Sequence, residues 1–263
     1  MGRERGFTLT EILIAVSIIA VIAAIAIPNM LAAKLSANEA SAIATLRTLL
    51  SSQAQLQGSG KIDVDNDAVG EYGTFAELTG GTGVRRTYVF PSGGAPAGAT
   101  FVNQGAALDP PLLPEDLVES LNNQGELIKT GYGFMIFLPD AGDPARWVHE
   151  EVRTVTRGRG KSRTRVETMI LRNDTGGPNT IGLDLSENCW CAYARPVKRG
   201  NSGVRVFFTS QAGDILQSPN ESNRQEARNS PINGNAAYLG TGITSRTAVG
   251  TAGRDGNVWK IVN

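Results

Sequence analysis

The N-terminal part of the chain carries two hydrophobic patterns in succession. After a short, polar and basic start at residues 1–6, residues 12–27 form an apolar run that only Ser17 interrupts with a polar side chain. A sixteen-residue helix spans about 24 Å, and a helix from Phe7 to Leu31 would span about 38 Å, which is enough to cross the hydrocarbon core of a membrane. The run therefore predicts a membrane-spanning helix over residues 7–32.

Beyond this run the pattern becomes that of an amphipathic helix. Six apolar residues fall on one face at 100° per residue: Leu35, Ala42, Ile43, Leu46, Leu49 and Leu50. Glu39 is the exception on that face. We expect this continuation, residues 33–57, to pack beneath a sheet and to end near Gln57, before the glycines that follow.

Residues 58–263 predict a globular body that is rich in strands. The six expected strands are Tyr132–Leu138, Trp147–Val155, Arg163–Leu171, Cys189–Arg195, Val204–Ser210 and Val258–Val262. Residues 80–125 contain many Gly, Pro and Ala with little periodicity, so we expect a long surface excursion with a short helix at Pro114–Leu121. The predicted fold class is α+β, with a long N-terminal helix packed by its second half on an antiparallel β-sheet that has long loops.

A single acid, Glu11, lies inside the segment that should enter lipid. An ionised carboxylate deep in a bilayer costs a few kcal/mol unless it is paired. A secretory signal would place a small-residue cleavage site after the apolar run, and none stands out against the alanine-rich sequence. Arg3 and Arg5 instead favour a start that stays in the cytoplasm, with the C-terminal end of the helix outside.

The residues around Gly6 resemble a known processing site. Gly6-Phe7-Thr8-Leu9-Thr10-Glu11, followed by the apolar run and Pro28, is similar to the N-terminus of type IV prepilins and of type II secretion pseudopilins. The resemblance implies that a prepilin peptidase removes residues 1–6 and methylates the new amino group of Phe7. It also implies that this ammonium pairs with Glu11. Thr10 departs from the family, which usually has a hydrophobic residue there.

The same resemblance implies that Pro28 distorts the helix, because proline removes one backbone hydrogen bond and kinks or locally melts it. The expected partners are further copies of the chain in a filament, the prepilin peptidase, an inner-membrane assembly platform and other pilins or pseudopilins. We expect a single pass through the bacterial inner membrane, with the body periplasmic or extracellular and the assembled filament at the cell surface or in the periplasm.

Three functions stay open at this point. The first is a structural subunit of a type IV pilus-like filament, and the second is a pseudopilin of a type II secretion system. The major pseudopilin usually carries an acidic calcium loop near its C-terminus, which residues 256–263 do not resemble, so the pattern tilts toward the first function or toward a divergent secretion component. The third is a membrane-tethered binding or enzymatic domain. The sequence has no phosphate loop and no Gly-x-Ser-x-Gly motif, so an enzyme is not expected.

Alternating acids after the helix suggest calcium as a cofactor, and no other cofactor is indicated. Asp63, Asp65 and Asp67 could converge on one cation, with Glu71 as a further ligand. The match to an EF-hand loop is incomplete, because Ala68 replaces the glycine at the sixth position and a threonine stands at the twelfth. A solvated acidic turn is the alternative.

The two cysteines, Cys189 and Cys191, would lie on one face of a strand, either as buried thiols or as a strained disulfide across one residue. They are too few for a disulfide framework, and with His149 as the one histidine they do not make a metal site.

A basic arm is expected to form a β-hairpin with an exposed tip, with binding of anionic surfaces as the alternative. Its cations are Arg153, Arg157, Arg159, Lys161, Arg163 and Arg165. The formal net charge of the chain is zero and aromatic residues are sparse in the arm, so nucleic-acid binding is not favoured.

Overall fold

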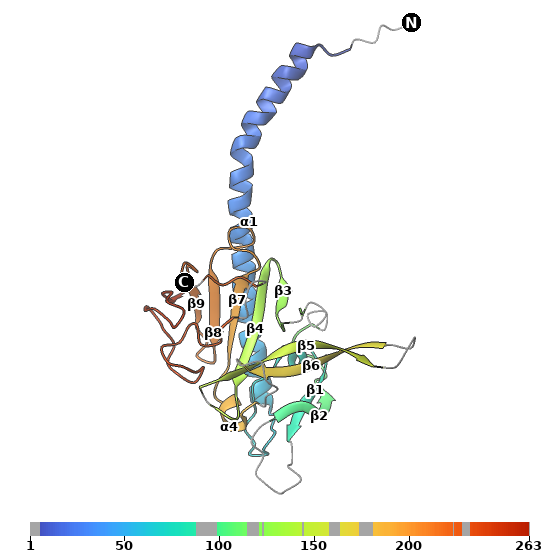
Figure 1. The fold of residues 1–263 in the computed structure, drawn as a ribbon, viewed down its shortest axis with the longest axis vertical. Helices are drawn as coiled ribbons and strands as arrows, with labels where there is room; N and C mark the ends of the chain where they lie inside the picture. Colours follow the sequence, from blue (N-terminus) through green and yellow to red (C-terminus); the bar gives the residue numbers. More distant parts are fainter. Residues whose placement is uncertain are drawn as a thin grey trace.

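A long helix and a sheet-based body make up the computed structural model (Figure 1). The structure describes residues 6–87, 99–114, 121–122, 124–143, 145–157, 164–173, 181–222, 224–227 and 232–262. One half of the helix runs along the body and the other half extends beyond it. The predicted α+β class is therefore confirmed.

Helix α1 spans Leu9–Ser59 without interruption. Its C-terminal cap is Gly60, whose φ of 59° is left-handed and so suits glycine. The helix ends at Ser59, two residues beyond the predicted Gln57. Pro28 lies inside it, and local melting at this residue is not observed. The helix instead curves through its projecting half (Figure 1).

The main sheet is antiparallel throughout, with the strand order β10-β9-β8-β7-β4-β5-β6 and β3 beside β4. Its strands are β3 Leu127–Lys129, β4 Tyr132–Pro139, β5 Trp147–Arg157, β6 Thr164–Asn173, β7 Cys191–Pro196, β8 Val206–Ser210, β9 Ile215–Ser218 and β10 Lys260–Ile261. Strand β4 pairs with β5 only at Leu138 and Pro139, so the β5–β6 hairpin leaves the sheet and projects sideways (Figure 1).

A second, two-stranded sheet lies within the segment that was expected to be an irregular excursion. It pairs β1 (Gly83–Thr87) with β2 (Ala99–Ala107), so the prediction of a loop over the whole of residues 80–125 is wrong. Register shifts between Gly83 and Arg86 interrupt the pairing, which explains why the sequence there lacks a strand period. The expected helix at Pro114–Leu121 falls largely outside the described residues.

Other differences from the predicted strands are small. Cys189 precedes β7 instead of lying in it, and Val258 forms an isolated bridge before the short strand β10. Strand β9 was not predicted, and neither were two single-turn helices, α2 (Phe75–Leu78) and α4 (Leu183–Ser186). These elements have four residues each, which is too short for a clear periodic signal.

The body has hydrophobic cores on both faces of the sheet. One contains Leu46 and Leu49 of α1 against Phe134 and Ile136 of β4, as the amphipathic pattern predicted. The other contains the alternate residues of β4 under the C-terminal segment, with these members among others: Met135, Phe137, Tyr193, Phe208, Tyr238 and Trp259. Because both faces are covered, β4 is hydrophobic along its whole length instead of alternating.

Candidate functional site

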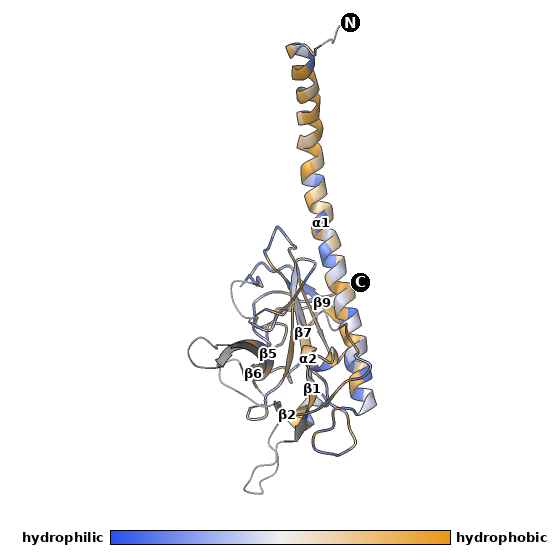
Figure 2. Cartoon of the chain, turned by 90° about the vertical axis from the view of Figure 1, so that its right-hand side faces the viewer, coloured by the Kyte–Doolittle hydropathy of each residue, from blue (hydrophilic) through white to orange (hydrophobic). Residues whose placement is uncertain are grey.

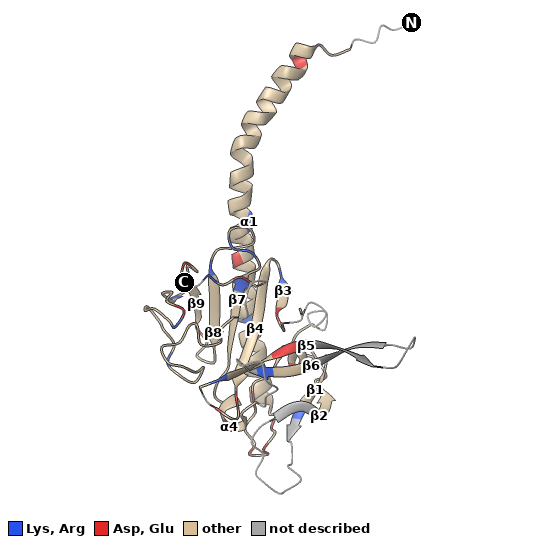
Figure 3. Cartoon of the chain, viewed as in Figure 1, with Lys and Arg blue, Asp and Glu red and all other residues tan. Residues whose placement is uncertain are grey.

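The projecting half of α1, residues 9–34, exposes most of its apolar side chains. Leu9, Leu13, Ile19 and Ile27 are among those with more than half of their surface exposed. Figure 2 shows this half as mostly hydrophobic and clear of the body, and Figure 3 shows it almost without charge. By length and composition the helix can cross a membrane. An apolar surface of this extent needs lipid or protein to cover it.

At the start of this half, Thr8 and Glu11 form a capping box. The backbone N–H of Thr8 donates to Oε2 of Glu11 at 2.8 Å, the Thr8 hydroxyl donates to the same oxygen at 2.7 Å, and the Glu11 N–H donates to the hydroxyl at 3.3 Å. The arrangement satisfies amide groups that have no partner within the helix. The Thr-x-x-Glu spacing could have predicted it from sequence.

Phe7 is 84% exposed and stands directly before the capping box. In the uncleaved chain its nitrogen is an amide, so the ion pair with Glu11 needs removal of residues 1–6 and stays a prediction. The carboxylate that would receive the new cation is already held at the helix end by Thr8. Among the described residues, no atom beyond its chain neighbours lies within 4 Å of a Cβ added at Gly6.

Where α1 enters the body, Glu39 joins the helix to the sheet. Its Oε1 accepts from the backbone N–H groups of Val204 at 3.0 Å and Arg205 at 3.1 Å, and its Oε2 accepts from the Arg205 guanidinium at 2.8 Å. Burial by itself would raise the pKa of Glu39, but the hydrogen bonds and charge of Arg205 and the Val204 N–H outweigh it and hold the pKa low. This explains the acid on the apolar face.

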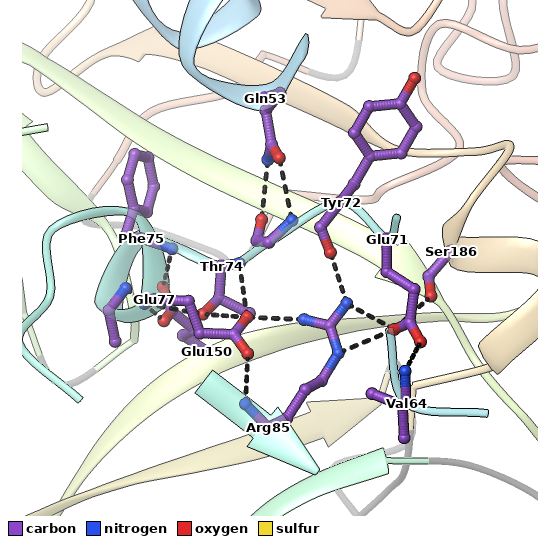
Figure 4. Close-up of polar contacts among 12 residues, drawn as sticks. Gln53, Val64, Glu71, Tyr72, Thr74, Phe75, Glu77, Arg85, Glu150 and Ser186 are labelled. Carbon is purple, nitrogen blue, oxygen red and sulfur yellow. Dashed lines mark hydrogen bonds and ion pairs between the residues drawn. The ribbon is translucent and has the colours of Figure 1, made fainter. Parts of the chain in front are cut away.

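Below the packed half of α1, charged side chains form an internal network (Figure 4). The Arg85 guanidinium contacts Glu71 at 2.9 Å and Glu77 at 2.6 Å, and the side chains of all three residues are fully buried. Gln53 connects the network to α1, because its amide exchanges two hydrogen bonds with the backbone of Gly73.

Glu150, from β5, belongs to the same network. Its two oxygens accept from the N–H groups of Phe75 at 2.9 Å and Ala76 at 2.8 Å, at the beginning of α2. Complete burial raises the pKa of Glu150 to about 7. These carboxylates face internal donors, so the network joins α1, α2, β1 and β5 and does not present an open acid–base pair to a substrate.

The structure brings together three of the four acids that were predicted to bind calcium. One carboxylate oxygen from each of Asp63, Asp65 and Asp67 lies within 4.8 Å of the others. Glu71 is outside this group, because it pairs with Arg85 in the interior and also accepts from Val64 N and the Ser186 hydroxyl. Its predicted role as a ligand is therefore replaced by a structural one.

The remaining candidates do not form a reactive centre. Cys189 and Cys191 are free thiols, and burial raises the pKa of both. Burial, together with the charge of Arg172, lowers the pKa of His149 to about 4. The backbones of Arg153, Arg157 and Arg165 lie in the β5–β6 hairpin as expected, whereas the tip of the basic arm lies outside the described residues.

An exposed apolar helix on a body that holds only its second half fits a membrane-anchored subunit with a helix available for packing. Residues 1–27 match the family model described as the prokaryotic N-terminal methylation motif. The type IV wide pilus major component PilA4 of Thermus thermophilus is 44% identical over 57 residues, which are 22% of this chain and 44% of that protein. The chain thus matches less than half the length of this curated relative. No solved structure matches the chain.

The two matches and the architecture support a type IV pilin-like or pseudopilin-like family. Members of such a family are structural subunits and not enzymes. The family implies prepilin processing and filament assembly with other pilins, and the apolar helix fits a membrane-anchored pilin of the cell surface.

Proposed function

We propose that the chain is a structural subunit of a type IV pilus-like filament. A prepilin peptidase cuts after Gly6 and methylates Phe7, and residues 7–32 then serve as a membrane anchor and later as the filament core. The observation that carries this proposal is the projecting half of α1, which has apolar side chains on all sides and is not covered by the described part of its own body. Covering each large side chain with neighbouring helices is worth about 1.5–3 kcal/mol relative to water.

The capping box supports a specific role for Glu11 in assembly. Cleavage creates an ammonium group at Phe7, next to the Thr8 N–H that already donates to Glu11. Residues 7–33 contain no charged residue other than Glu11, so its countercharge must come from an amino terminus or from outside this segment. Packing helices together excludes water, which strengthens the attraction between the two charges.

A pilus is favoured over a secretion pseudopilus because the curated relative is a pilus component. Microscopy of cells that express a tagged copy separates the two assemblies. Filaments that extend from the cell surface support the proposal. A tagged chain that stays periplasmic and is needed for protein secretion would assign it to the pseudopilins instead.

Processing is tested by the mass of the purified chain. The wild type should begin at Phe7 and carry one added methyl group. Gly6→Ala should retain residues 1–6, because the residue before the cut is changed, while the body keeps its fold. A wild-type chain that retains its N-terminal methionine would contradict the proposal.

The role of Glu11 is tested by two substitutions that differ in one property. Glu11→Gln keeps an oxygen that can accept from Thr8 but removes the charge, whereas Glu11→Ala removes both. We expect both variants to insert into the membrane and both to lose most filament incorporation, measured as the tagged chain recovered in sheared filaments. Normal incorporation of Glu11→Gln would show that the capping box, and not the charge, is what assembly needs.

A further inference from the structure

The β5–β6 hairpin extends beyond the sheet that holds its base. Strand β5 pairs with β4 only through Trp147 and Val148, whereas it pairs with β6 as far as Arg157 and Thr164. Beyond Val152 the two strands continue for five residue pairs, about 16 Å at the usual rise of a strand. This outer hairpin, residues 153–157 and 164–168, projects sideways across the direction of α1 (Figure 1). A two-stranded hairpin is only marginally stable by itself in water, so a partner surface would stabilise it.

Strand register divides the outer hairpin into two unlike faces, because residues alternate along a strand and directly paired residues share a face. One face, called the arginine face below, has a valine pair, two threonines and two arginines but no acid. Its members are Arg153, Val155, Arg157, Thr164, Val166 and Thr168. The opposite face has mixed charge, since Arg165 and Glu167 both lie on it.

At the base of the arginine face, the nearest acid already has a basic partner. Glu151 lies on this face and forms an ion pair with the Arg172 guanidinium, and each side chain is 27% exposed. From Glu151 outward, the register brings no further acid to the paired positions of this face. Arg153 and Arg157 therefore give the arginine face an excess of positive charge.

The rest of the chain has the opposite charge. The chain has 25 basic and 25 acidic side chains, and residues 153–165 contain six of the basic ones and none of the acidic ones. The remainder therefore has 19 basic and 25 acidic side chains. Exposed acids of the described body include Asp67, Asp184, Asp214 and Glu221. A second copy thus offers surface of complementary charge, whereas two such hairpins side by side would bring like charges together.

A helical filament requires contacts of this unlike kind. Copies that repeat without closing into a ring join two different surfaces of the same chain. A basic hairpin and an acidic body are two such surfaces. Exposed ion pairs contribute only about 0–1 kcal/mol each, so this contact alone is too weak to hold two bodies together. Packing of the projecting halves of α1 would supply the high effective concentration at which a weak contact forms.

We propose that the arginine face docks on an acidic surface of a second copy of the chain and so sets how neighbouring bodies are placed in the filament. This inference rests on the proposed filament function. Arginine suits the task, because its guanidinium can bind a carboxylate through two parallel hydrogen bonds. The pair Val155 and Val166 lies between the arginines and supplies the apolar centre that such a contact needs.

Charge variants of the full chain test the contact. Arg153→Glu combined with Arg157→Glu should lower the tagged chain recovered in sheared filaments by roughly tenfold or more, because attraction becomes repulsion. Arg153→Lys combined with Arg157→Lys keeps the charge and should keep most of the yield. Arg165→Glu changes a cation of the opposite face and should also keep it. Near-ultraviolet circular dichroism in detergent should show the same folded body in all of them.

These variants separate the docking proposal from the filament proposal. Wild-type yield from the double glutamate variant, or an equal loss from Arg165→Glu, would overturn docking through the arginine face. A wild-type chain that forms no filaments would instead contradict the proposed function itself.

Photo-crosslinking identifies what the hairpin contacts while both arginines stay in place. Thr168→p-benzoylphenylalanine puts the reactive group on the arginine face, and Thr154→p-benzoylphenylalanine puts it on the opposite face as the control. In filaments, the Thr168 variant should give a covalent dimer whose crosslinked peptide contains Asp or Glu, and the Thr154 variant should give much less. Equal dimer yields from the two positions would overturn the proposal. Crosslinks from position 168 only to lipid, to nucleic acid or within one chain would overturn it as well.

Discussion

Several buried charged side chains in this body form ion pairs with one another. Arg85 pairs with Glu71 and Glu77, and Arg195 pairs with Glu126 through its Nε at 2.7 Å. Replacing one partner of such a pair leaves an uncompensated charge in the interior, which typically costs about 3–5 kcal/mol. The acids of the body are therefore part of its internal structure as well as of its surface.

Glu150 makes the stability of the body depend on pH. Its folded pKa of about 7 lies above the ordinary value of 4.5. Between these two values the folded state binds a proton that the unfolded state has released, so this contribution is fully present below pH 4.5 and is lost as the pH rises through 7. The shift corresponds to about 3 kcal/mol. Glu150→Gln should therefore show a flatter dependence of stability on pH than the wild type.

The measurement is thermal or denaturant unfolding of the full chain in detergent from about pH 4.5 to 7.5. Unfolding is monitored by near-ultraviolet circular dichroism. All three tryptophans, Trp147, Trp190 and Trp259, are buried in the body and report its packing. Equal slopes for Glu150→Gln and wild type over this interval would refute the assigned pKa.

At the scale of elements, α1 is one continuous helix whose two halves lie in different environments. Leu46 is fully buried under the sheet, whereas Leu13 is 61% exposed on the projecting half. Leu46→Ala should destabilise the body by about 2–5 kcal/mol, because it removes contacts and leaves a cavity. Leu13→Ala should leave the unfolding of the body unchanged and reduce filament yield. Equal effects of the two variants on body stability would contradict this division of the helix.

For the whole molecule, this division predicts that the body folds without the anchor. Contacts between α1 and the body begin near Asn38, whose amide donates at 2.7 Å to the carbonyl of Ser202 in the turn between β7 and β8. A chain that starts at Leu35 should therefore be folded and monomeric in water, because it lacks the exposed apolar half. Light scattering coupled to size-exclusion chromatography gives the mass. Aggregation of this chain would indicate that the body itself carries an assembly surface.

Local patterns in the sequence were enough to predict the helices and strands whose formation depends on neighbouring residues. The apolar run predicted the projecting helix, and the helical period identified the face that includes Leu46 and Leu49. Runs of hydrophobic, aromatic and β-branched residues placed β4, β5 and β8 close to their observed bounds, whereas β1, β2 and β9 were missed because bulges or short length remove the period. The capping box at Thr8 and Glu11 could also have been read from spacing.

Only the tertiary structure decided which charges meet. Glu39 finds Arg205 across 166 residues, and Glu71 turns away from the acidic loop to pair with Arg85. Helix and strand periods arise from each segment's own geometry, so sequence by itself determined the anchor and the class of fold. Ion pairs come from segments that the packed core brings together, so they depend on the fold.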